Sequence, residues 1–206
     1  MVFGVLIYPG VEELDFQGPW EMAGMWHKYG GGPKPVLLAQ SDAPVSCAHG
    51  MRVLPDQTFA TCGALKYLLV PGGYAAFEEM KNPLLTDFVR QRSEQVRAIL
   101  SVCSGSFILL AAGLLQGRQA ATNWKVIGML RQAGVEVLEQ RFVQDGKVWT
   151  SAGVSAGIDA TLALIAGEAG EAVASQVQLN AEYYPSPKTY GTAHRAPAGA
   201  AYFRSL

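Results

Sequence analysis

The chain has 206 residues; half of them are apolar, 16% are charged, and the formal net charge is -1. This composition excludes a disordered chain, and the balanced charge leaves no electrostatic footprint for binding nucleic acid or an anionic membrane. The length is enough for one substantial hydrophobic core, and no linker divides the sequence, so we expect a single domain over residues 1–206.

The first segment, residues 2–8, is an apolar run that predicts a β-strand, and Pro9 ends it far short of a membrane span. No basic leader or cleavage site precedes it, so we expect no targeting segment. The three cysteines, Cys47, Cys62 and Cys103, are odd in number and too widely spaced for a disulfide framework. Together these features predict a cytoplasmic protein with no membrane association.

Further apolar runs without alternation lie at residues 36–39, 67–70 and 98–102. They are typical of parallel strands that are covered on both faces. The amphipathic stretch 83–92 between them predicts a helix, with a proline in its first turn. Residues 45–59 differ from these segments and predict short strands at an edge of the sheet.

The segment after residue 134 predicts a hairpin and ends in a tail. Residues 135–144 and 147–150 flank Asp145-Gly146, a dipeptide that favours a tight turn between two antiparallel strands. Residues 185–206 are rich in Gly, Ala and Pro. They predict an irregular surface tail.

Two helices rich in small residues are predicted at residues 160–166 and 172–181, separated by Gly167 and Gly170. Helices of this composition pack closely against a sheet. With the preceding strands and helix, they predict an α/β sandwich with a mostly parallel central sheet. Right-handed crossovers then place the functional crevice at the carboxyl ends of the strands.

Asp15 lies in the loop after the first strand, between two apolar residues and just before Gly18-Pro19. A carboxyl group in such surroundings has a raised pKa and can transfer protons near neutrality. Asp15 would serve equally well as the N-cap of a helix that begins near Pro19, and the residues leave both interpretations open. The adjacent Glu12 and Glu13 are expected to form a solvated pair.

Pro71-Gly72-Gly73 follows the strand predicted at residues 67–70. Glycines let the backbone approach a ligand closely, so these N–H groups, together with that of Ser104, could form an oxyanion hole. Any Pro-Gly-Gly sequence also favours a simple tight turn, which is the competing interpretation.

Cys103 ends the strand predicted at residues 98–102 and precedes the helix-forming stretch 107–112. A thiol at this strand-to-helix elbow projects above the carboxyl edge of the sheet, where the free N–H groups of the next helix favour the thiolate. The arrangement has the mechanics of a nucleophile elbow, with Cys in place of Ser. A buried cysteine that packs as a small hydrophobe fits the same segment, so both interpretations stay open.

The histidines have no helical or hairpin spacing, so we predict neither a metal site nor a cofactor; they are His27, His49 and His194. Three aromatic residues are candidates for the walls of a substrate pocket, with core packing as their alternative role. These are Trp20, Tyr74 and Trp124.

The three loops together resemble the ThiJ/PfpI superfamily of class I glutamine amidotransferase-like domains. The similarity is greatest to the branch that contains bacterial isocyanide hydratase and the amidotransferase-like domains of AraC-type regulators. The resemblance runs nearly end to end. The matching segments are residues 5–8, 14–19, 70–73, 101–106, 111–118, 145–146, 150–153, 155–159 and 182–187.

The resemblance implies a flavodoxin-like three-layer sandwich and a homodimer whose active sites lie near the subunit interface. It also assigns roles to individual residues. Cys103 becomes the elbow nucleophile and Asp15 its acidic partner, while Gly72, Gly73 and Ser104 become backbone donors.

Two positions depart from the pattern of the relatives. Many relatives have Thr-His-Trp where this chain has Thr122-Asn123-Trp124, and Asn123 cannot act as a base. This departure argues against a Cys-His protease or amidotransferase. Ser104 stands where isocyanide hydratases have Thr, and the loss of a methyl group predicts a pocket of different shape.

The function implied by the resemblance is a cysteine-dependent lyase that adds water to an isocyanide. The product would be an N-substituted formamide, formed through a thioimidate on Cys103. Two alternatives stay open: glyoxalase or deglycase chemistry on an aldehyde, and a non-catalytic small-molecule or redox-sensing domain. Direct transcriptional regulation is not expected, because the tail after Tyr184 is too short for a helix-turn-helix pair. The expected partner is therefore a small-molecule electrophile.

Overall fold

The computed structural model describes residues 1–185 and residue 202. Its centre is a seven-stranded sheet in the order β10-β11-β7-β6-β1-β2-β5. All neighbours are parallel except β10 and β11. The strands of this sheet are β1 (Val2–Leu6), β2 (Pro35–Ala39), β5 (Gln57–Thr58), β6 (Leu65–Val70), β7 (Ala98–Val102), β10 (Phe142–Asp145) and β11 (Val148–Ser151).

Two short ribbons complete the strands of the described residues. One pairs β3 (Val45–Ser46) with β4 (Arg52–Val53), and the other pairs β8 (Gln119–Ala120) with β9 (Glu136–Val137). β3, β4 and β5 confirm the short strands expected between residues 45 and 59, and β5 lies at one edge of the main sheet. Every residue of β7 and all but one of β6 are buried, as the unbroken apolar runs predict for central parallel strands.

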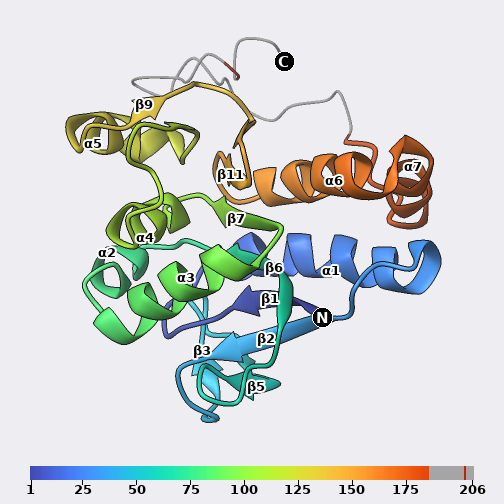
Figure 1. Cartoon of the computed structure of the whole chain (residues 1–206), viewed down its shortest axis with the longest axis horizontal. Coiled ribbons are helices and arrows are strands. Elements are labelled where there is room, and N and C mark those ends of the chain that lie inside the picture. Colours follow the sequence, from blue (N-terminus) through green and yellow to red (C-terminus); the bar gives the residue numbers. More distant parts are fainter. Residues whose placement is uncertain (186–201, 203–206) are drawn as a thin grey trace.

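Helices cover both faces of the sheet, so the predicted three-layer α/β sandwich is confirmed (Figure 1). One layer consists of α1 (Glu13–Gly30), α6 (Ala156–Ala169) and α7 (Glu171–Asn180), which pack on one another. The other contains α2 (Ala76–Glu79), α3 (Pro83–Gln95) and α4 (Gly105–Ala111). A 3-10 helix at Trp124–Val126 leads into α5 (Ile127–Gln132), which packs against β9.

The hairpin and the C-terminal helices differ from their predicted bounds. The first strand of the hairpin begins at Phe142 rather than at residue 135, because residues 136–137 pair with the distant β8 instead. The turn itself is confirmed, and Gly146 has a φ of 61°. α6 begins at Ala156 and runs through Gly167, so that Gly170 alone separates it from α7.

The first helix begins earlier than expected, at Glu13, which places Asp15 in its first turn and Pro19 inside it. The N-cap position belongs to Glu12. The N-cap interpretation of Asp15 is therefore wrong. Pro19 has no N–H, so the helix gives up one backbone hydrogen bond at this point.

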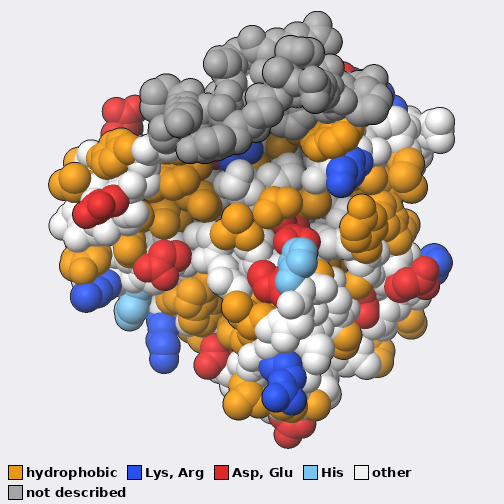
Figure 2. Space-filling view, turned by 180° about the vertical axis from the view of Figure 1, so that it is seen from behind, with side chains coloured by type: hydrophobic (Ala, Val, Ile, Leu, Met, Phe, Trp, Pro, Cys, Tyr) orange, Lys and Arg blue, Asp and Glu red, His pale blue; other side chains and the backbone are white. Residues whose placement is uncertain are grey.

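The surface carries apolar and charged side chains in a mixed pattern. Figure 2 shows one face, on which apolar side chains are widely spread and acidic and basic ones lie among them singly or in small groups. Most of the predicted tail lies outside the described residues, although Tyr202 is half-buried and packs against the core. No helix within the described part of the chain is both long and apolar enough to cross a membrane.

α6 lies close to both the sheet and α1 at Gly157. A Cβ atom at this position would lie 2.8 Å from Cγ2 of Val102 and 2.9 Å from Cγ of Pro19. We expect Gly157→Ala to lower the free energy of unfolding by roughly 1–3 kcal/mol because the two elements must move apart. Chemical denaturation measures this change.

Gly167→Ala is the matched control in the same helix, because a Cβ atom there would meet nothing within 4 Å. Alanine should stabilise the helix at this position by about 0.5–1 kcal/mol. Equal effects of the two substitutions would contradict close packing at Gly157.

Candidate active site

Cys103 lies at a sharp turn between β7 and α4, at the carboxyl edge of the central sheet. Its φ of 58° lies in the left-handed region, which is rare for a residue other than glycine and typical of a strained functional turn. Two side-chain hydroxyl groups hold the Cys103 carbonyl oxygen: Thr122 at 2.9 Å and Ser106 at 3.2 Å. The residue as a whole is 7% exposed. The elbow predicted from the sequence is therefore present.

Asp15 projects from the first turn of α1 into the interior and is completely buried. Its Oδ2 accepts a hydrogen bond of 2.8 Å from the Gly72 N–H. Its Oδ1 is buried and has no hydrogen-bond partner among the described residues, although the Cys103 thiol acts to lower the pKa of this carboxyl. Burial raises the pKa of Asp15 to about 8, so the carboxyl holds a proton at neutral pH.

The sulfur of Cys103 faces three N–H donors from three different segments. The side-chain Nδ2 of Asn123 lies 3.3 Å from Sγ. The amide orientation is fixed, because Asn123 Oδ1 accepts a bond of 3.0 Å from the Lys125 N–H. The backbone N–H groups of Ser104 and Val154 are the other two, and both lower the pKa of the thiol. All three stabilise a negative charge on the sulfur.

Burial and the negative charge of Asp15 raise the pKa of Cys103, whereas the three donors lower it. Ionisation of either group therefore makes ionisation of the other less favourable. A state with one negative charge on the pair costs less than a state with two. The sulfur has three donors and the carboxyl has one. The three donors reduce the cost of a negative charge on the sulfur, so a thiolate beside a protonated Asp15 is a state that this arrangement can support during a reaction.

The N–H groups of the glycine turn after β6 bond to side chains of the site, and their role as oxyanion donors stays a prediction. Gly72 donates to Asp15, and the Gly73 N–H donates to the Ser104 hydroxyl at 3.0 Å. Ser104 in turn donates to the Gly73 carbonyl at 2.8 Å, and Tyr8 donates to the Gly72 carbonyl at 3.0 Å. The two glycine amides thus hold Asp15 and Ser104 in place, and of the expected backbone donors only that of Ser104 reaches the sulfur.

A pocket opens above Cys103. Its apolar walls come from Tyr74, Phe77, Val126 and Val154. Tyr74 is the only one of the three aromatic candidates that lines it. Trp20 borders a separate hollow between α1 and the end of α7, and Trp124 precedes the wall residue Val126. Two charged residues, Glu12 and Lys125, also line the pocket.

One group within the described residues brings three possible metal ligands together: Glu12, Glu13 and His49. His49 Nδ1 lies 2.7 Å from Glu13 and 3.5 Å from Glu12. This proximity escaped the sequence analysis, which expected the two glutamates to form a solvated pair. Hydrogen bonding to the imidazole accounts for the geometry, and the absence of a metal centre stays a prediction.

Sequence analysis missed two of the three donors to the sulfur. Asn123 was noted only as a lost base, and Val154 was not singled out. Val154 is β-branched yet has a φ of 48°, a backbone conformation that no local sequence pattern predicts. The other cysteines, Cys47 and Cys62, are buried, neither lines the pocket, and burial raises the pKa of each thiol.

The raised pKa of Asp15 predicts how stability depends on pH. The folded state binds the Asp15 proton more tightly than the unfolded state does, so its contribution is complete below about pH 4 and is lost as the pH rises through about 8. We expect Asp15→Asn to remove this loss. The unfolding temperature of the wild type, measured from pH 4 to pH 9, should fall relative to that of the variant.

The exposed Asp42→Asn serves as the control, and its unfolding temperature should run parallel to that of the wild type. Parallel curves for Asp15→Asn as well would show that this carboxyl is ionised in the folded protein at neutral pH, against our assignment.

Comparisons with known proteins agree with this geometry. Residues 3–167 match the model of the DJ-1/PfpI family. An isonitrile hydratase from Pseudomonas putida is 37% identical over 185 residues, which cover 89% of this chain and 79% of the relative. The HTH-type transcriptional regulator CdhR from Pseudomonas aeruginosa is 31% identical over 143 residues, which cover 68% of this chain and 42% of the regulator.

A crystal structure of a ThiJ/PfpI family protein from Pseudomonas syringae is also similar, with a TM-score of 0.86 and 34% sequence identity. The match covers 98% of this chain and 82% of the other. The family model, the relative from Pseudomonas putida and this crystal structure all agree with the resemblance inferred from the three loops. The chain belongs to the DJ-1/PfpI family.

Proposed function

We propose that the protein is a cysteine-dependent enzyme that adds water to an isocyanide and releases an N-substituted formamide. The observation that carries this proposal is the buried pair of Asp15 and Cys103. The carboxyl is held by one backbone N–H, while the sulfur faces three donors. This asymmetry supplies a nucleophilic thiolate and a neutral acid side by side, which is the combination that isocyanide hydration requires.

In the first step, the Cys103 thiolate attacks the terminal carbon of the isocyanide and forms a carbon–sulfur bond. The attacked carbon gains negative charge and takes the proton of Asp15. The result is a thioimidate on the enzyme and an ionised Asp15 carboxylate. Because this carboxylate is buried and accepts a hydrogen bond only from the Gly72 N–H among the described residues, it is strongly basic at this stage.

In the second step, water adds to the thioimidate carbon. Asp15 takes a proton from the water and passes it to the nitrogen, which gives a tetrahedral adduct. Collapse of the adduct breaks the carbon–sulfur bond and forms the formamide carbonyl, and the hydroxyl proton returns to Asp15. The thiolate and the neutral acid are regenerated, so one acid is sufficient and no histidine is needed at position 123.

The pocket suits this class of electrophile. Cys103 is buried at the base of the pocket, and an isocyanide presents its reactive carbon at the end of a linear group that can reach the sulfur. The organic substituent would lie between the apolar walls formed by Tyr74, Phe77 and Val126. The relative from Pseudomonas putida gives independent support, since isonitrile is another name for isocyanide.

A non-catalytic sensing domain is the second candidate, supported by the similarity to the regulator CdhR. A thiolate held by three donors is also susceptible to oxidation. Under this alternative, Cys103 would be oxidised to sulfinic acid without turnover of any electrophile. The expected homodimer and cytoplasmic location stay predictions for both candidates.

Incubation of the reduced protein with an aryl isocyanide, followed by chromatography of the formamide, tests the proposal. We expect Cys103→Ala to form no product, because the nucleophile is gone. Asp15→Asn should be slower by a factor of at least about 100, since the amide cannot transfer the proton. Cys47→Ala is the matched control for loss of a buried thiol and should retain wild-type activity.

Product formation by Cys103→Ala at the wild-type rate would contradict the mechanism. If the intact wild type forms no formamide from aryl or alkyl isocyanides, the substrate class is wrong. Parallel assays with methylglyoxal and with hydrogen peroxide then distinguish aldehyde chemistry from sensing.

A further inference from the structure

We propose that Arg141 is a positioning residue for the nucleophile. By binding both Ser155 and Asp159, it holds the turn at residues 152–155 so that the Val154 N–H points at the sulfur of Cys103. The proposal deepens the proposed function, because it concerns the same thiolate, but its test needs no isocyanide.

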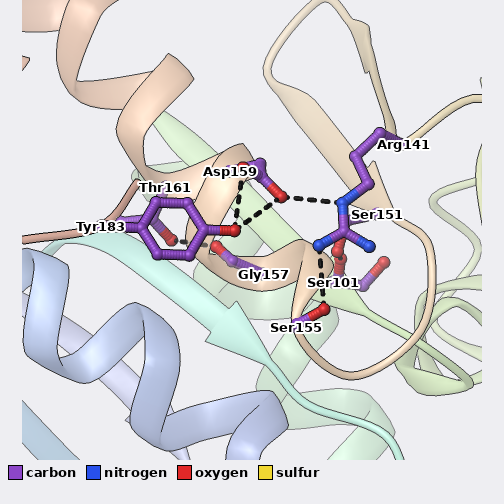
Figure 3. A network of polar contacts seen from close by, with 8 residues as sticks. All are labelled: Ser101, Arg141, Ser151, Ser155, Gly157, Asp159, Thr161 and Tyr183. Carbon is purple, nitrogen blue, oxygen red and sulfur yellow. Dashed lines mark hydrogen bonds and ion pairs between the residues drawn. The ribbon is translucent and has the colours of Figure 1, made fainter. Parts of the chain in front are cut away.

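The side chain of Arg141 bridges two points at the start of α6 (Figure 3). Its Nε donates to Asp159 Oδ2 at 2.7 Å, and its Nη2 donates to the Ser155 hydroxyl at 2.9 Å. The Tyr183 hydroxyl lies 3.2 and 3.3 Å from the two oxygens of the same carboxyl. The carboxyl is thus held from two sides, and the arginine in turn fixes the residue that follows Val154.

The backbone of Arg141 fixes the other end of the turn. Its carbonyl accepts a hydrogen bond of 2.9 Å from the Ala152 N–H. The Ala152 carbonyl in turn accepts a bond of 3.0 Å from the Cys103 N–H. One residue therefore holds the chain on both sides of Val154 and is linked through a single residue to the backbone of the nucleophile.

Val154 requires such support because its backbone is in an unfavourable conformation. A φ of 48° is a genuine outlier for a β-branched residue and persists only where the surroundings impose it. In this conformation Val154 lines the same pocket as Cys103, and its N–H lowers the pKa of the thiol. If the turn relaxed to an ordinary conformation, this donor would turn away and the sulfur would lose one of its three N–H groups.

The effect of Arg141 on the thiol is transmitted through the turn rather than through its charge. The groups that act on Cys103 are Asp15 from α1 and the donors Ser104, Asn123 and Val154. Tyr8 and Tyr202 respond to the charge of the thiolate, and Glu12 and Lys125 line the same pocket. Burial raises the pKa of Tyr202, a group that also faces Cys103, and the positive charge of Arg141 lowers it, so the test uses a variant that keeps this charge.

The experiment follows alkylation of Cys103 by iodoacetamide from pH 5 to pH 11, quantified on the Cys103 peptide by mass spectrometry. Arg141→Lys keeps the charge but cannot bind Asp159 and Ser155 together in the same fork geometry. We expect its pH profile to move to higher pH. Below the midpoint the rate should fall about fivefold, the effect of losing one hydrogen bond to the thiolate, and at high pH the rates should converge.

Two further variants test whether Arg141 acts on Cys103 through the turn at residues 152–155. Ser155→Ala keeps the pair of Arg141 and Asp159 and should move the profile in the same direction. Arg118→Lys is the control, because it alters another arginine–aspartate pair, in which Arg118 lies 2.8 Å from Asp145. The side chains of this pair are 36% and 30% exposed, similar to the 38% and 28% of Arg141 and Asp159. The control variant should leave the profile unchanged.

The proposal is overturned if Arg141→Lys or Ser155→Ala reproduces the wild-type profile. It is also overturned if Arg118→Lys shifts the profile as much as Arg141→Lys does, because the effect would then be a general loss of stability. Neither outcome depends on isocyanide turnover, so this proposal and the proposed function can fail separately.

Discussion

The rest of the site depends on a carboxyl group that is buried with too few hydrogen bonds to stay charged. Asp15 is completely buried, and among the described residues its carboxyl accepts a hydrogen bond from the Gly72 N–H alone. An ionised group in this position would be costly, so it holds a proton, and its natural acceptor is the sulfur of Cys103. A thiolate beside this neutral acid is the state that the proposed reaction requires. The proposed chemistry thus begins with a desolvated acid.

The thiolate must then be stabilised by other parts of the chain, and the parallel sheet makes this possible. The ends of β1, β6 and β7 bring Asp15, Gly72 and Cys103 to one edge. The donors come from Ser104, Asn123 and the turn before α6. Because each lies on a different segment, the charge on the sulfur depends on how well these segments pack. Two residues with positive φ, Cys103 and Val154, are held at this edge by the same packing.

The sequence predicts the parts of the site that depend on local patterns. The apolar runs predict the central strands, and the abrupt end of one run at Cys103 predicts the elbow. It does not predict contacts between distant segments. Asn123 reaches Cys103 across 20 positions, and Arg141 reaches Asp159 across 18. The same limit explains the hairpin, because residues 136–137 have strand-like sequences on their own but pair with β8.

The replacement of a histidine by Asn123 bears directly on which reactions this sulfur can support. Cleavage of an amide needs a group that protonates the departing amine. The Asn123 amide is neither an acid nor a base near neutral pH, so it cannot supply that proton. It can only donate its N–H to the sulfur, which it does at 3.3 Å. Such a donor stabilises the thiolate without entering a proton transfer, so in the proposed reaction all proton movement falls to Asp15. Addition of water across one carbon is a reaction that a single acid can complete, because the proton it gives up in the first step returns to it in the last.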